Sequence, residues 1–199
     1  TDLVLASEGS FGPHPSLGFV PANEEILFLQ DAKHNRTYRV KTLQTATNFA
    51  QAHCSDWASL KNFAERVRFP SHALILRNSH HLHKGINTWT AMENIAAEGF
   101  PWEASTDMRA HLNPSRQAVI ALATKDLVDL LNSFCPACAA PGFGVSAVHP
   151  GLACAWCQFP TRLTQAWTKT CEVCGHNETI DFPQGEKTAD PQYCDRCNP

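Results

Sequence analysis

Short apolar runs separated by polar turns dominate the first half of the chain and predict β-strands. The run at residues 3–6 should form a short buried strand, and the run at residues 26–29 is too short for a helix and should form a central strand. Residues 38–43 alternate apolar and polar side chains, and the turn at residues 33–35 makes them the antiparallel partner of the second run. The apolar run at residues 73–76 predicts a further strand.

Helical periodicity marks three other segments. Ser55 is expected to cap a helix that runs to about residue 68 with its apolar side chains on one face. A short helix should start at Thr90 and stop at Gly99. Asn113 is a good N-cap, and the proline after it suits a first helical position, so a long helix should run to about residue 134. We therefore predict an α+β domain with a mixed β-sheet over residues 1–134.

The stretch at residues 7–15 contains two glycines and two prolines, which disfavour both a helix and a continuous strand. We expect a loop that follows the first strand. Small residues in such a loop expose backbone N–H groups, which suits an anion or metal–phosphate site. The candidate residues for that site are Glu8, Gly9, Ser10, Gly12 and His14. The alternative is a turn-rich surface connection without a ligand.

A second candidate stretch, residues 106–116, leads into the long helix. Arg109 and Arg116 flank the helix N-terminus, where the helix dipole favours phosphate or carboxylate. Asp107 could hold Mg²⁺ or act as a base. In the structural alternative, Asp107 pairs with one of the two arginines and fastens the start of the helix to the sheet.

Three histidines, His80, His81 and His83, lie close together in the sequence. On a strand His81 and His83 would share a face, which permits metal binding. We favour a polar edge or turn, because the sequence places no matching carboxylate nearby.

The last third of the chain carries eight cysteines in four Cys-x-x-Cys pairs. Each pair points two thiolates at one point in space, so two pairs complete a tetrahedral Zn²⁺ site. The eight ligands therefore predict two structural zinc ions, with no open coordination position for a substrate. The predicted ligands are Cys135, Cys138, Cys154, Cys157, Cys171, Cys174, Cys194 and Cys197.

The spacing of the pairs suggests how they combine. Fifteen residues separate Cys138 from Cys154 and nineteen separate Cys174 from Cys194, and each gap contains its own turn. We therefore prefer pairing in sequence order, which gives two Cys₄ zinc ribbons over residues 135–199. An interleaved arrangement is the alternative, and a disulfide framework is disfavoured because the ninth cysteine, Cys54, makes the count odd. Cys54 itself is expected to be a buried, inert thiol.

Composition and charge narrow the classes of function. With 43% hydrophobic and 18% charged residues the chain is typical of a globular protein, and we expect a cytoplasmic one that does not bind membranes. The net charge is −3. From Cys135 onward four basic residues face six acidic ones, so the basic surface that nucleic-acid binding needs is missing there.

Several motifs together resemble an uncharacterised bacterial family, the domain of unknown function numbered six-six-seven-one. The matching segments are ASEGSFGPHP, TDMRA, NPSR, PGF, GLACAWC, FPTR and DPQYCDRCNP. The resemblance spans nearly the whole chain and implies no activity. It also implies that family members continue upstream of the ASEGSFGPHP segment, so an upstream part could contribute to a ligand site.

Two functions follow as hypotheses. In the first, the protein is a Mg²⁺-dependent hydrolase of a nucleotide or another phosphate ester, in which Glu8, Glu25 and Asp107 hold the metal. Arg109 and Arg116 would then neutralise phosphate and His14 would act as an acid or base. In the second, it is a non-catalytic module that binds a small phosphate-bearing ligand or a protein, with zinc ribbons in a structural role.

Overall fold

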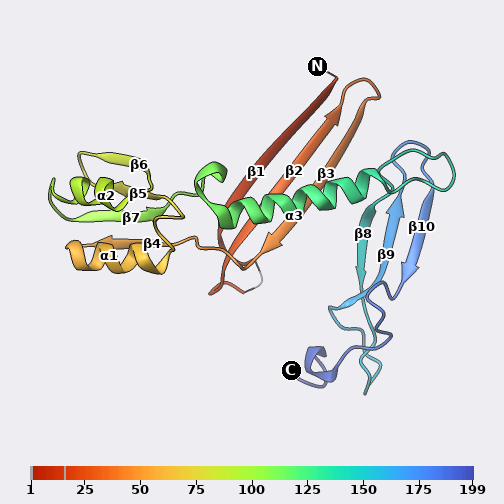
Figure 1. Cartoon of the computed structure of the whole chain (residues 1–199). Helices are drawn as coiled ribbons and strands as arrows, with labels where there is room; N and C mark the ends of the chain where they lie inside the picture. The colour runs from red at the N-terminus through yellow and green to blue at the C-terminus, as the bar shows by residue number, and fades with distance from the viewer. Residues whose placement is uncertain (1, 16) are drawn as a thin grey trace. The chain divides into compact units, whose positions relative to one another are not determined.

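The computed structural model describes residues 2–15 and 17–199. The chain divides into two compact units, residues 1–127 and 128–199 (Figure 1). The long helix α3 (Pro114–Leu131) contains the boundary between them. It begins at the residue expected from the Asn113 cap and ends slightly before the predicted residue 134.

One sheet of the first unit has the strand order β1-β2-β3, formed by β1 (Leu3–Pro13), β2 (Pro21–Asp31) and β3 (Arg36–Gln44). The predicted hairpin of β2 and β3 is confirmed. The loop predicted at residues 7–15 is wrong for residues 7–13, because β1 continues through Pro13. As an edge strand β1 pairs only with β2, and its prolines lie at or beyond its end, where they remove no hydrogen bond from the strand interior.

The other sheet of the first unit has the order β4-β7-β5-β6. Its strands are β4 (Gln51–Cys54), β5 (Leu74–Arg77), β6 (Leu82–Ile86) and β7 (Trp102–Thr106). Helices α1 (Trp57–Arg66) and α2 (Trp89–Ala96) supply the rest of its core. That core includes Leu60, Met92 and Trp102, together with the fully buried Cys54 thiol, whose pKa is raised by burial.

The second unit contains one three-stranded sheet of order β10-β9-β8. Its strands are β8 (Val145–Pro150), β9 (Thr164–Thr170) and β10 (Asn177–Asp181). Two short 3₁₀ helices complete the chain, η1 (Ala110–Leu112) before α3 and η2 (Pro191–Tyr193) near the C-terminus.

The α+β class is confirmed. The sheets of the described residues are all antiparallel, however, so the expectation of a mixed sheet is wrong. Among the residues that the structure describes, no helix is both long enough and apolar enough to cross a membrane.

Candidate functional site

The four Cys-x-x-Cys pairs fold into similar knuckles. In each one the residue after the second cysteine donates its N–H to the carbonyl oxygen of the first cysteine, at 2.9–3.0 Å. These bonds join Ala139 to Cys135, Gln158 to Cys154, Gly175 to Cys171 and Asn198 to Cys194. The turn also aims backbone N–H groups at the first sulfur. The N–H of Cys174 lowers the pKa of Cys171 to about 6, and the N–H of Cys157 lowers that of Cys154 to about 7.

The knuckles combine into two clusters of four thiols. One contains Cys135, Cys138, Cys171 and Cys174, and the other contains Cys154, Cys157, Cys194 and Cys197. Sulfur–sulfur distances across the clusters are 3.6–3.9 Å. A ZnS₄ tetrahedron with 2.3 Å bonds has edges of about 3.8 Å, whereas a disulfide holds its sulfurs about 2.0 Å apart. Each cluster could therefore hold one zinc ion, and all nine cysteines are free of disulfides.

The pairing is interleaved, so the preferred pairing in sequence order is wrong. The reason lies in the strands between the knuckles (Figure 1). Strand β8 leads the chain from the first cluster to the second, β9 leads it back, and β10 leads it to the second cluster again. Each gap thus contains one strand of the shared sheet in place of a complete hairpin. Because the six residues of β8 span about 20 Å, successive knuckles lie at opposite ends of that sheet.

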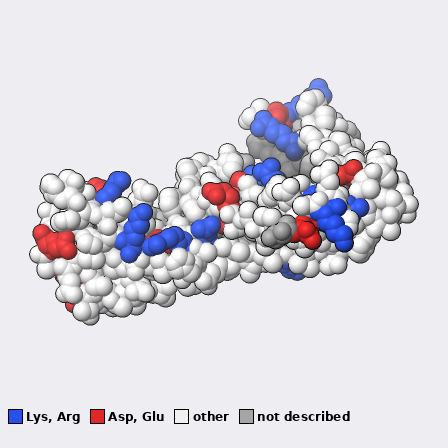
Figure 2. All heavy atoms as spheres, turned by 90° about the horizontal axis from the view of Figure 1, so that it is seen from above, with Lys and Arg blue, Asp and Glu red and all other residues white. Residues whose placement is uncertain are grey.

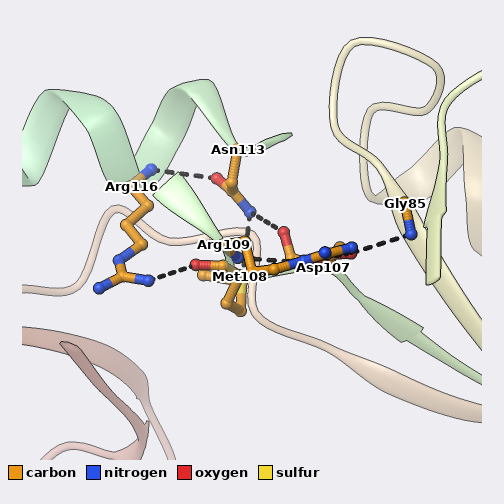
Figure 3. A network of polar contacts seen from close by, with 6 residues as sticks. All are labelled: Gly85, Asp107, Met108, Arg109, Asn113 and Arg116. Carbon is orange, nitrogen blue, oxygen red and sulfur yellow. Dashed lines mark hydrogen bonds and ion pairs between the residues drawn. The ribbon is translucent and has the colours of Figure 1, made fainter. Parts of the chain in front are cut away.

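The candidate residues near the start of α3 form a polar network (Figure 3). The Asp107 carboxylate is buried and accepts hydrogen bonds from Nε and Nη2 of Arg109, the latter at 2.6 Å. It also accepts the N–H of Gly85 at 3.1 Å. Burial would raise the pKa of Asp107, but the hydrogen bonds from Arg109 outweigh it and hold that pKa below its usual value. Asp107 is therefore an ionised anchor for Arg109.

Glu25 and Arg116 form a second ion pair. The Glu25 side chain is fully buried and accepts Nη2 of Arg116 at 3.0 Å, while Nη1 of Arg116 donates to the carbonyl of Met108 at 2.7 Å. Gly9 lies directly opposite Glu25 on the neighbouring strand. A β-carbon at Gly9 would lie 2.6 Å from Nη2 of Arg116, so only glycine leaves room for this pair.

These two ion pairs border a cleft of about 280 Å³. Lys84, Arg109 and Arg116 give the cleft three cationic groups, and the Arg116 guanidinium lies 5.3 Å from the centre of the Phe11 ring. The remaining lining residues are Ile75, Asp107 and Met108. On the face drawn in Figure 2, basic and acidic side chains are interspersed.

The N-terminus of α3 is closed by protein groups. The Asn113 side chain accepts the N–H of Arg116 at 3.0 Å, and Nε2 of His72 accepts the N–H of Ser115 at 3.2 Å. Burial lowers the pKa of His72, which favours the neutral ring that this acceptor role requires. The helix start therefore directs its first N–H groups to the protein and does not use them for a ligand. The cations of the cleft come from side chains instead.

The structure brings only part of the predicted site together. Glu8 pairs with Ile26 and Gly9 with Glu25, so Glu8 and Ser10 project to the opposite face of the sheet from Glu25. A β-carbon at Gly12 would meet no atom within 4 Å. The remaining candidate, His14, belongs to the turn between β1 and β2, where its Nδ1 accepts the N–H of Leu17.

Other residues of this region escaped sequence reasoning. Lys84 and Gly85 lie on β6. No sequence motif around them indicates that they lie near residues 106–116 in the fold. Their position directly after His80, His81 and His83 was the one sequence feature that could have marked them as candidate site residues. Glu98 is a further case, because the structure places it beside His81 and His83, where no carboxylate was expected.

Comparison with known proteins assigns the chain to one protein family. No curated protein and no solved structure matches the chain. One family does match, over residues 1–199, and its description is "Domain of unknown function (DUF6671)". Because the match covers residues 1–199, the chain belongs to this family, DUF6671.

Proposed function

We propose that the first unit binds a small phosphate-bearing ligand in the cleft beside α3, and that the second unit is a structural zinc module. The observation that carries the proposal is the convergence of three cationic side chains, Lys84, Arg109 and Arg116, on one cleft. Fixed cations at a concave site are the groups that recognise phosphate oxygens.

The three cations are held in different ways. Both arginines are fixed by buried carboxylates, so little side-chain entropy is lost when they contact a ligand. Arg109 keeps 47% of its side chain exposed and uses Nε and Nη2 for Asp107, so Nη1 lies outside this ion pair. Lys84 has no carboxylate partner among the described residues. It is therefore the cation whose charge is least compensated in the cleft.

The size of the cleft limits the ligand. About 280 Å³ lies near the lower end of the range for small-molecule sites, which suits a phosphate group and little more. A second hollow of about 300 Å³ on the four-stranded sheet shares Ile75 and Lys84 with the cleft. A nucleotide would place its phosphate between Lys84 and Arg109 and extend its remaining atoms toward either Phe11 or this second hollow.

Hydrolysis with Mg²⁺ is the more specific hypothesis, and the geometry gives it less support than binding. Mg²⁺ needs carboxylate oxygens that are free to coordinate it. Glu25 and Asp107 already pair with arginines, and Glu8 lies on the other face of its sheet. A hydrolytic site would require the ligand to displace those arginines, whereas simple binding requires no rearrangement.

A thermal-shift experiment tests the proposal. Zinc-loaded protein is screened against inorganic phosphate, nucleotides and sugar phosphates, with and without Mg²⁺. A ligand at about one hundred times its Kd should stabilise the protein by roughly 2.7 kcal/mol. Lys84→Ala should reduce the shift strongly. Lys33→Ala, which removes the same charge from the turn between β2 and β3, should not.

Two results would count against binding at this cleft: no shift with any phosphate compound, or an equal shift in wild type and Lys84→Ala. Release of inorganic phosphate that depends on Mg²⁺ and disappears in Asp107→Asn would instead establish the hydrolase.

The structural role of zinc rests on the closed ligand sets. Each cluster offers four thiols, which complete a tetrahedral site and leave no position for a substrate. Around the first cluster the apolar core consists of Ala140 and Phe143 packed against Cys135 and Cys171. So small a core contributes little burial, and zinc would supply the missing stability.

A further inference from the structure

A third group of metal-ligating side chains lies in the first unit, far along the chain from the cysteines. It consists of His81, His83 and Glu98, whose ligand atoms all lie within 4.8 Å of one another. The cluster shares no residue with the cationic cleft. An inference about it therefore stands independently of the proposed function.

The fold fixes each of the three residues. The Asn78 side chain accepts the N–H groups of His80 and His81, at 2.9 and 2.7 Å, and so shapes the turn that precedes β6. His83 lies on β6 opposite Leu76, with its ring 5.7 Å from that of Trp102. Glu98 follows the C-terminus of α2, where its N–H donates to the carbonyl of Ile95.

The two distances from the Glu98 carboxylate to the imidazole nitrogens fit a shared metal ion better than hydrogen bonds. Oε2 of Glu98 lies 3.2 Å from Nδ1 of His81 and 3.4 Å from Nε2 of His83. Two ligand atoms at about 2.1 Å from one metal lie about 3.0 Å apart in octahedral and about 3.4 Å apart in tetrahedral coordination. By contrast, the hydrogen-bonded pair of His53 and Glu103 on neighbouring strands is 2.6 Å apart.

His83 supplies a second observation. Its Nε2 atom is buried and has no hydrogen-bond partner among the described residues, although it points toward Glu98. A buried polar atom without a partner costs about 1–3 kcal/mol. A metal ion at this position would satisfy that nitrogen. It would also neutralise the Glu98 carboxylate, which is 39% exposed.

We propose that His81, His83 and Glu98 bind a divalent first-row transition metal. Two imidazoles and one carboxylate suit Zn²⁺, Fe²⁺, Co²⁺ or Ni²⁺, whereas Mg²⁺ and Ca²⁺ prefer oxygen ligands alone. Three protein ligands leave coordination positions open, and the three side chains are 32–54% exposed. This site therefore differs from the closed thiolate clusters and offers its metal to an external ligand.

Metal stoichiometry tests the proposal. Protein that comprises residues 1–199 is dialysed against excess Zn²⁺, and bound metal is measured by elemental analysis. Wild type should hold three zinc ions per chain, while His83→Ala and Glu98→Gln should hold two. Glu103→Gln is the matched control, because it removes a carboxylate from the His53 pair on the same sheet and should keep three.

Co²⁺ added to protein that holds zinc only in its two Cys₄ clusters gives a second readout. The third site should show weak visible bands without the intense thiolate-to-cobalt absorption of a Cys₄ site. Glu98→Gln should weaken this binding at least tenfold. Because Glu98 is partly exposed, that variant should fold even if His83→Ala does not. Two zinc ions in wild type, or a third ion that remains in Glu98→Gln, would overturn the proposal.

Discussion

The pair of Glu25 and Arg116 joins β2 to the first turn of α3, and Glu25→Gln tests how much it contributes. The substitution preserves the size of the side chain and removes its charge. The Glu25 side chain is fully buried and that of Arg116 is 15% exposed. The variant therefore leaves a guanidinium in a largely buried position without a counter-charge.

The expected loss of folding free energy is about 3 kcal/mol. Removal of one partner of a buried ion pair costs about 3–5 kcal/mol, because the remaining charge stays desolvated. The lower end of this range of free energy applies here, because Arg116 keeps its hydrogen bond to the Met108 carbonyl and its side chain is partly exposed to water. For a unit of this size such a loss lowers Tm by about 10 °C.

Urea unfolding of zinc-loaded protein, followed by circular dichroism, measures the difference between wild type and Glu25→Gln. The double variant Glu25→Leu/Arg116→Leu provides the control, because it removes both charges and should lose less than the single variant. A loss below about 0.5 kcal/mol in Glu25→Gln, or a double variant that loses as much stability as Glu25→Gln, would refute the reasoning.

Three further predictions concern other parts of the chain. Gly9→Ala should destabilise the first unit by about 1–3 kcal/mol, because the new methyl group displaces the Arg116 guanidinium; urea unfolding measures this, and an unchanged midpoint contradicts it. The lowered pKa of Asp107 means that its stabilising effect is complete above about pH 4 and is lost as the pH falls through the native pKa. When the pH is lowered below about 4, the free energy of unfolding should therefore decrease less in Asp107→Asn than in wild type. Urea unfolding at a series of pH values measures this difference. Chelation of zinc should unfold residues 128–199 and leave residues 1–127 protected, which hydrogen exchange resolves; uniform protection throughout would contradict a structural role for zinc.

The sequence was sufficient for features that depend on local periodicity. The cap at Asn113, the alternation in β3 and the short apolar run in β2 predicted elements that the structure contains. The helix caps shifted by one or two residues, since Asp56 and Thr88 accept the capping hydrogen bonds in place of Ser55 and Thr90. Neighbouring polar residues compete for such a role, and only the final backbone geometry decides between them.

Features that depend on long-range contacts were not predictable in the same way. The pairing of the knuckles follows from which strands share a sheet, and turns at Gly151 and Gly185 are compatible with either arrangement. The loop expected around Gly9 failed for a related reason: glycine was interpreted as a residue that interrupts a strand, whereas here it makes room for the side chain of Arg116. Glu98 joined the histidines only through the packing of α2 against the four-stranded sheet.

The interleaved pairing also sets the order in which the two clusters can be completed while the chain is synthesised at the ribosome. The ligands of the first cluster are complete once Cys174 has left the ribosome. At that time Cys154 and Cys157 have also left it, but the other two ligands of their cluster have not. The second cluster must wait for Cys194 and Cys197. The nascent chain therefore passes through a stage with one complete site and one half-site of two exposed thiols. During that interval we expect the half-site to be open to oxidation or to binding of another metal, and zinc supplied during translation should then raise the yield of correctly assembled protein.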